Sequence, residues 1–222
     1  MGRPSACTVY LIRHGETDWN RSGIWQGHAQ VPLNAAGQQQ AMRLARRLAD
    51  EGVRFDALYS SDLSRAWETA AVLGGALGLS PVAAAALREI DLGAWSGKTR
   101  AQITLEFPEE WRRIQNNEDL PRGGGETVAA CTQRVMAWMD RTAERHTGRT
   151  ICAVTHGGCI RNALLHALDL TWAERNRIPS LDNASITVMQ RGTGGWRAVR
   201  MNDVEGIHSA GGEEGWPEDK KG

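Results

Sequence analysis

Two histidine–glycine pairs follow short apolar runs of the sequence. His14 and Gly15 come directly after Arg13, and His156 and Gly157 follow a second run. A neutral imidazole is a good nucleophile toward phosphorus when one ring nitrogen is free and a backbone carbonyl holds the other. The Arg13 guanidinium offers a fork of donors for phosphate oxygens, and Gly15 lets a tetrahedral group approach the backbone. These residue types predict a site for phosphoryl groups.

Two further segments supply the charges and the proton that such chemistry needs. The segment SSDLSRAWETA places Arg65 near the start of a predicted helix, where backbone N–H groups also favour an anion. The segment LREIDLGAWSG offers Glu89 as proton donor to a leaving alkoxide, with Asp91 as the rival. His156 could donate a hydrogen bond to an equatorial oxygen. Two arginines and a histidine would then stabilise the charge without a metal ion.

The elements that must position these residues alternate along the chain. Strands are predicted over residues 8–13, 57–60, around Val82 and 150–155, helices over 34–51, 63–77, 127–145 and 157–168, and a closing hairpin over 185–190 and 196–201. This alternation predicts an α/β domain with a mostly parallel sheet. Because ligands bind beyond the carboxyl ends of parallel strands, both histidines are expected at one edge of the sheet.

Smaller features set the expected boundaries. Asn34 is expected to cap the first long helix, and Asp62 the next. Residues 98–122 interrupt the alternation and predict a helical excursion that caps a pocket. Residues 203–222 are rich in glycine and charge, so we expect a polar, disordered C-terminal tail.

Composition excludes several classes of function. The 222 residues carry 26 basic and 26 acidic side chains, so neither a nucleic-acid nor a membrane surface is expected. No signal peptide or membrane span is visible. The four cysteines form no CxxC pair, which favours a reduced, cytoplasmic setting. A neutral chain has weak colloidal repulsion, which is compatible with a homodimer.

Taken together, four segments resemble the signatures of a known family. LIRHGETDWN, SSDLSRAWETA, LREIDLGAWSG and VTHGG resemble, in the same order, those of the histidine phosphatase superfamily, branch 1, which has a phosphoglycerate mutase-like fold. The likeness runs from about residue 8 to 201. It implies a three-layer sandwich, with a central sheet flanked by helices. It also implies one domain over residues 1–202, with 98–122 as its cap, and catalysis without a metal or another cofactor.

The resemblance also implies roles for individual residues. His14 would be the nucleophile that becomes phosphohistidine. Arg13, Arg65 and His156 would bind the phosphoryl group. Glu89 would protonate the leaving group and then activate the water that cleaves the phosphoenzyme.

Other residues are expected around the phosphate. The expected binding residues are Asn20, Gln26, Gly27 and the backbone N–H of Gly157, with Trp95 as a pocket-lining side chain. Trp25 and Trp111 are weaker candidates for the same lining. The remaining histidines, His28, His146, His166 and His208, are expected on the surface or in helices.

The family includes phosphatases and mutases with the same core. The stretch between Glu89 and His156 is compact here, and LREIDLGAWSG looks more like the phosphatase versions. We therefore expect a phosphomonoesterase for small metabolites such as phosphoglycerates, phosphoserine or sugar phosphates. A cofactor-dependent phosphoglycerate mutase is the alternative. A non-catalytic phosphate-binding regulator fits less well, because the nucleophile and the acid are both retained.

Overall fold

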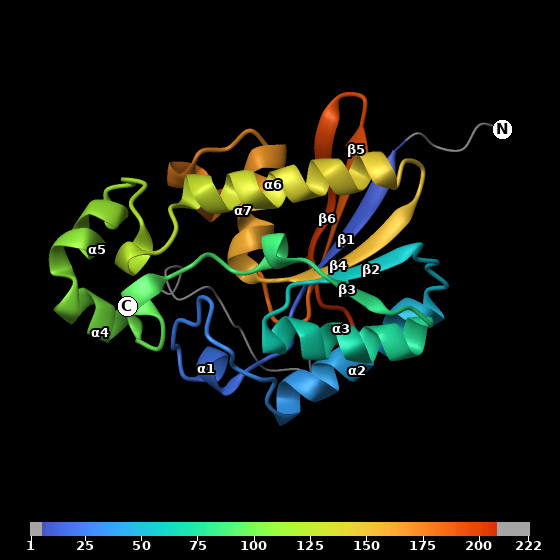
Figure 1. Ribbon diagram of the computed structural model, residues 1–222, viewed down its shortest axis with the longest axis horizontal. Helices are drawn as coiled ribbons and strands as arrows, with labels where there is room; N and C mark the ends of the chain where they lie inside the picture. The colour runs from blue at the N-terminus through green and yellow to red at the C-terminus, as the bar shows by residue number, and fades with distance from the viewer. Residues whose placement is uncertain (1–5, 208–222) are drawn as a thin grey trace.

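A six-stranded sheet forms the centre of residues 6–207, the part of the chain that the computed structural model describes (Figure 1). Its order is β3-β2-β4-β1-β5-β6. The strands are β1 (Cys7–Arg13), β2 (Ala57–Ser60), β3 (Pro81–Ala83), β4 (Thr150–Thr155), β5 (Ile186–Gly192) and β6 (Gly195–Asp203). Strands β1 to β4 pair in parallel, whereas β5 pairs antiparallel with both of its neighbours, β1 and β6. The prediction of an α/β fold with a mostly parallel sheet is confirmed.

Helices cover both faces of this sheet. The α-helices are α1 (Asp18–Arg21), α2 (Ala35–Asp50), α3 (Ser64–Leu77), α4 (Arg100–Glu106), α5 (Pro108–Gln115), α6 (Val128–Arg145) and α7 (Gly157–Ala167). Short 3-10 helices are η1 (Ala85–Leu87), η2 (Gly93–Trp95), η3 (Arg122–Gly124) and η4 (Trp172–Arg177). Figure 1 shows α2 and α3 on one face and α6 and α7 on the other, which confirms the three-layer arrangement.

The alternation of side chains along β1 supplies both halves of the core. Leu11 belongs to the apolar cluster that contains Leu164 of α7. The next residue, Ile12, belongs to a second cluster with Leu44 of α2. Successive side chains of a strand point to opposite faces, so one buried strand anchors helices on both sides and is held rigidly at its carboxyl end.

Local capping explains where two helices begin. The Asn34 Oδ1 accepts a hydrogen bond of 2.8 Å from Gly37 N, as expected for the cap of α2. The expectation for Asp62 is wrong. The N-cap of α3 is Leu63 and receives no side-chain hydrogen bond, whereas Asp62 accepts two hydrogen bonds from Arg88. The guanidinium partner is on a distant segment and outcompetes the local backbone.

The segment 98–122 contains α4 and α5, which lie at one end of the molecule (Figure 1). Trp111 and Ile114 of α5 are buried.

The ordered fold continues beyond the expected domain boundary at residue 202. Strand β6 extends to Asp203, and Ile207 is fully buried in the apolar cluster that contains Leu44 of α2. The tail expectation is thus wrong for residues 203–207, and residues 208–222 lie outside the described part.

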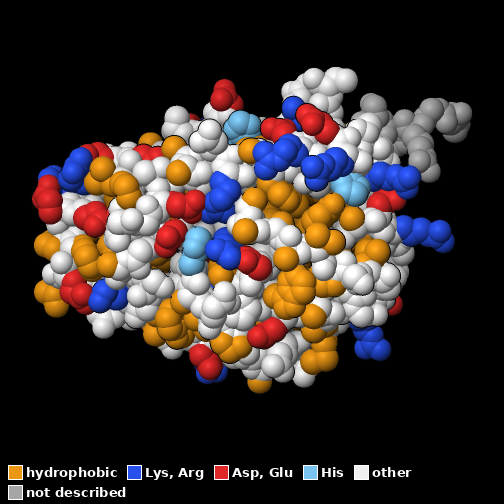
Figure 2. Space-filling model, viewed as in Figure 1, with side chains coloured by type: hydrophobic (Ala, Val, Ile, Leu, Met, Phe, Trp, Pro, Cys, Tyr) orange, Lys and Arg blue, Asp and Glu red, His pale blue; other side chains and the backbone are white. Residues whose placement is uncertain are grey.

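Surface charge is mixed. On the face shown in Figure 2, Lys and Arg side chains are interspersed with Asp and Glu, in line with a formal net charge of zero. Within residues 6–207, none of the helices has the length and apolar character needed to span a membrane.

Candidate active site

The two histidines meet because their strands are neighbours. Arg13 of β1 pairs in register with Thr155 of β4, and His14 N donates to Thr155 O at 3.0 Å. Each histidine directly follows its strand. The ring centroids of His14 and His156 are consequently 5.1 Å apart.

A backbone contact fixes the state of the His14 ring. Its Nδ1 lies 2.7 Å from the carbonyl oxygen of Gly15, which can only accept, so Nδ1 carries the proton. The lone pair is then on Nε2, which receives a hydrogen bond of 3.2 Å from Arg65 Nε. Burial, and then the charges of Arg65 and Arg13, hold the pKa of His14 well below its usual value of 6.5. The imidazole is therefore neutral and nucleophilic near neutral pH.

Arg65 is held by backbone carbonyls. It lies in the first turn of α3 and is almost fully buried. Its Nη1 and Nη2 donate to the carbonyl oxygens of Ala29 and Gly27 at 2.9 and 2.8 Å. Burial lowers its pKa to about 10, which still leaves the group cationic at neutral pH. Carbonyl oxygens orient the fork without cancelling its charge, so the site offers a positive charge to an anion.

Arg13 reaches the same site from the end of β1. One of its Nη atoms donates to the carbonyl oxygen of Leu181, and the side chain lines the pocket that contains His14. The guanidinium groups of Arg13 and Arg65 thus line the same pocket as the imidazole of His14.

The carboxylate of Glu89 faces this pocket from the loop that follows η1. Its Oε2 and Oε1 accept hydrogen bonds from the backbone N–H groups of Gly158 and Ile90, at 3.1 and 2.9 Å. A Cβ at Gly158 would lie 2.3 Å from Oε1, so only glycine allows this approach. The rival Asp91 instead accepts from Gly93 N at 3.0 Å, and its side chain does not line the pocket. The geometry favours Glu89.

The pocket has an empty volume of about 420 Å³, part of which is open to solvent. It is lined by Arg13, His14, Asn20, Ile24, Trp25, Gln26, Gly27, Arg65, Glu89 and Leu92. Cationic groups, a carboxylate and an imidazole thus share it with three apolar side chains. The expected binding residues Asn20, Gln26 and Gly27 all belong to this lining.

Three expected residues are not among those that line the pocket. Trp95 is fully buried and packs edge-on against Trp25, with 5.7 Å between ring centroids, so its expected place in the lining is wrong. Gly157 and His156 are also buried outside the lining. The Nε2 of His156 lies 2.8 Å from Ser61 Oγ, whereas its Nδ1 has no hydrogen-bond partner within residues 6–207. Burial, followed by the charge of Arg65, also holds the pKa of His156 well below its usual value.

Four residues near the site were missed or misjudged from the sequence. Ser61 contacts His156, and Thr69 Oγ1 accepts from Gly15 N at 3.1 Å. Asn183 Nδ2 donates to the His14 carbonyl at 3.0 Å. His28, expected on the surface or in a helix, donates from Nε2 to the Glu89 carbonyl at 2.8 Å. Ser61 directly follows a predicted strand, a position that could have indicated it. The others act through contacts between segments far apart in the chain.

Among residues 6–207, no group of three or more His, Cys, Asp or Glu side chains could hold a metal ion.

Known proteins resemble this chain over nearly its whole length. The family model of the histidine phosphatase superfamily (branch 1) matches residues 9–204. Phosphoglycerate mutase-like protein 4 of Arabidopsis thaliana is 34% identical over 208 residues, which cover 91% of this chain and 88% of the relative. The metal-independent phosphoserine phosphatase of the same plant is 33% identical, with 91% and 84% covered.

Solved structures agree with the sequence relatives. The structure of YhfR from Bacillus stearothermophilus superimposes with a TM-score of 0.83 at 32% sequence identity, covering 91% of this chain and all of that chain. Family model, relatives and structure point to one group of proteins. The chain belongs to the histidine phosphatase superfamily, branch 1.

Proposed function

We propose that this protein is a metal-independent phosphomonoesterase that hydrolyses small phosphorylated metabolites through a phosphohistidine on His14. The observation that carries the proposal is the state of that ring. The Gly15 carbonyl holds Nδ1–H, so the lone pair is on Nε2, to which Arg65 Nε donates at 3.2 Å. A neutral, positioned nucleophile next to a cation is what attack on a phosphate ester requires.

In the first step, His14 Nε2 forms a bond to phosphorus while the bond from phosphorus to the ester oxygen breaks. The charge on the phosphoryl oxygens is stabilised by Arg13 and Arg65. His156, whose Nδ1 is buried and lacks a partner within residues 6–207, would donate a hydrogen bond to one of these oxygens. Glu89 acts as the general acid and gives a proton to the departing alkoxide, which leaves as the alcohol.

In the second step, the phosphohistidine is hydrolysed. The Glu89 carboxylate accepts a proton from water as the water oxygen bonds to phosphorus. The bond from His14 Nε2 to phosphorus breaks, inorganic phosphate leaves, and both residues return to their starting states. The polar side chains of Asn20 and Gln26 in the pocket wall favour the entry of this water.

The relatives favour hydrolysis and also keep a second candidate open. One relative is named a metal-independent phosphoserine phosphatase, which matches the proposed reaction class. Another is named phosphoglycerate mutase-like, so a mutase that passes the phosphoryl group back to a phosphoglycerate is the alternative. The two functions share the first step and differ only in what accepts the phosphoryl group.

Phosphate release with EDTA present tests the proposal. The panel contains p-nitrophenyl phosphate, 3-phosphoglycerate, phosphoserine and sugar phosphates, each assayed with wild-type protein and with His14→Ala. We expect release that survives EDTA and disappears in the variant. No release from any ester, together with conversion of 3- to 2-phosphoglycerate, would favour the mutase instead.

A further inference from the structure

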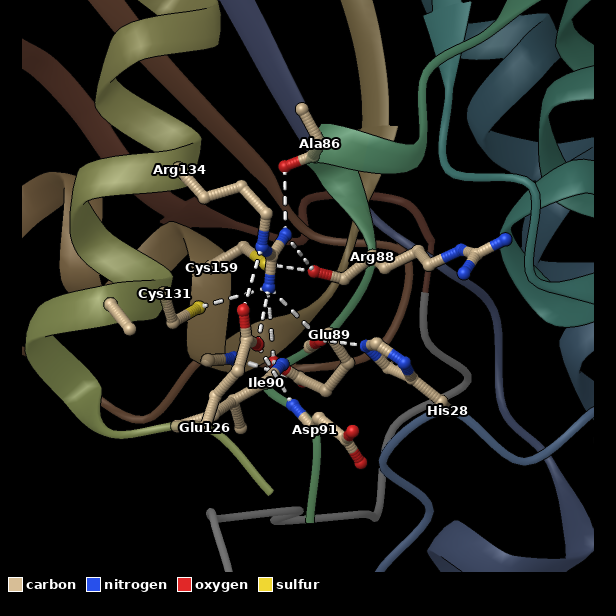
Figure 3. Close-up of polar contacts among 12 residues, drawn as sticks. His28, Ala86, Arg88, Glu89, Ile90, Asp91, Glu126, Cys131, Arg134 and Cys159 are labelled. Carbon is tan, nitrogen blue, oxygen red and sulfur yellow. Dashed lines mark hydrogen bonds and ion pairs between the residues drawn. The ribbon is translucent and has the colours of Figure 1, made fainter. Parts of the chain in front are cut away.

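Arg134 of α6 holds the backbone on both sides of Glu89 (Figure 3). Its Nη1 donates to the carbonyl oxygens of Ala86 and Arg88, both at 2.9 Å, and its Nη2 donates to that of Glu89 at 3.3 Å. Its Nε and Nη2 also donate to Glu126, at 2.9 and 2.7 Å. A guanidinium has five N–H donors, and these bonds use all five.

The segment needs such a partner because it has no regular structure of its own. Residues 89–92 lie between two short 3-10 helices and belong to neither. Buried carbonyl groups outside helices and strands must find donors elsewhere, and here one guanidinium serves those of Arg88 and Glu89, together with that of Ala86 in η1. Cys159 Sγ makes a further contact with Arg88 O at 2.9 Å.

Glu126 completes the arrangement from the other side. Its Oε2 accepts from Asp91 N at 3.0 Å, and its own backbone N–H donates to Asp91 O at 2.8 Å. The carboxylate therefore bridges Arg134 and Asp91. Because the charges of Glu126 and Arg134 compensate each other, the pair fixes the loop without adding a net charge beside Glu89.

We infer that Arg134, together with Glu126, is a positioning residue pair that holds Glu89 where it can transfer a proton. The inference rests on the proposed function, in which Glu89 is the proton donor. The Glu89 carboxylate accepts hydrogen bonds from the backbone N–H groups of Ile90 and Gly158 and has a long contact of 4.0 Å with Cys159 Sγ, so its place depends mainly on where the backbone is held. A displacement of about 1 Å can cost about 100-fold in rate.

The test compares two leaving groups in Arg134→Met, Arg134→Lys and Glu126→Gln. An alkyl phosphate such as phosphoserine needs a proton for its leaving group, whereas p-nitrophenyl phosphate has a leaving group that departs without one. The comparison uses kcat/KM, which reflects only formation of the phosphoenzyme and not its hydrolysis, a step that both esters share. We expect kcat/KM to fall about tenfold to 100-fold for the alkyl ester and to change by less than about threefold for the aryl ester. A lysine has one compact ammonium group and cannot replace the forked guanidinium, so Arg134→Lys should not restore the wild-type ratio of alkyl to aryl kcat/KM.

Arg88→Met is the matched control. The Arg88 side chain extends away from Arg134 in Figure 3 and pairs with Asp62, while its backbone carbonyl keeps the bond to Arg134. This variant alters the same segment without removing the hydrogen bonds that Arg134 donates to it. The ratio of alkyl to aryl kcat/KM in Arg88→Met should equal that of the wild type.

Glu89→Gln separates failure of this inference from failure of the proposed function. If Glu89→Gln lowers the ratio and Arg134→Met lowers it no further in that background, the two residues act as one unit and the inference stands. If Glu89→Gln lowers the ratio but folded Arg134 and Glu126 variants do not, the inference is overturned and the proposed function survives. If Glu89→Gln leaves the ratio unchanged, the acid assignment fails and the inference fails with it. Should Arg134→Met not fold, Arg134→Lys and Glu126→Gln decide by the same criterion.

Discussion

At the scale of single residues, backbone groups set the positions of several side chains of the candidate site. The Gly15 carbonyl sets the tautomer of His14, and the carbonyls of Gly27 and Ala29 orient Arg65. Backbone groups move only when the fold moves, so the site is organised before a ligand arrives. Such preorganisation is what makes electrostatic stabilisation of a transition state effective.

Gly158→Ala tests this dependence at Glu89. The added Cβ would lie 2.3 Å from Oε1, so the carboxylate must move away from the pocket wall. We expect turnover of alkyl phosphates to fall at least tenfold, measured as kcat on phosphoserine. Gly75→Ala is the control, because Gly75 lies in α3 with no atom within 4 Å of the added methyl group. Equal activity in both alanine variants would show that the close approach at Gly158 is unimportant.

At the scale of elements, the Asn34 cap fixes the start of α2 relative to the segment that follows His14. Asn34 caps α2 through Gly37 N, and its Nδ2 also donates to Glu16 Oε1. The helix is thereby tied to the segment that follows His14. Loss of the cap should weaken α2 and leave the sheet intact.

Asn34→Ala should lower the free energy of unfolding by about 1 kcal/mol, because Gly37 N loses its acceptor. For a chain of this size, the corresponding fall in Tm is about 2–4 °C. Gln39→Ala, at an exposed position of the same helix, should change stability by less than about 0.5 kcal/mol. Calorimetry of both variants is the measurement, and equal Tm values would contradict the capping role.

Sequence patterns predicted the elements well and the long-range contacts poorly. The strand ends at Arg13 and Thr155 and the cap at Asn34 follow from local rules, since apolar runs and capping residues act on their own neighbours. Asp62 was mispredicted because its partner, Arg88, is 26 residues away. The contact of Asn183 with His14 spans 169 residues. A single sequence holds no local signal for such pairs.

At the scale of the whole molecule, burying two neutral histidines couples the site to stability. His14 and His156 are both buried, and both have a pKa well below 6.5 in the folded protein. Below that pH the unfolded chain binds more protons than the folded chain. The free energy of unfolding must therefore decrease as the pH falls below about 6.5.

Chemical denaturation between pH 7.5 and about pH 5 should reveal this decrease. Each neutral histidine can contribute up to about 1.4 kcal/mol per pH unit in this range. The carboxylates with a lowered pKa, such as Asp203 at about 2, stay ionised above about pH 5 and do not contribute. His14→Asn should show a shallower dependence than the wild type. A wild-type stability that is flat over this range would contradict the neutral burial of both rings.

The most direct test of the central claim is to trap the phosphoenzyme. Wild-type protein is mixed with excess p-nitrophenyl phosphate, quenched in alkaline denaturant to preserve phosphohistidine, digested and mapped by mass spectrometry. We expect one added phosphoryl group on the peptide that contains His14, and none in His14→Ala. Phosphate on another residue, or wild-type turnover in His14→Ala, would contradict it.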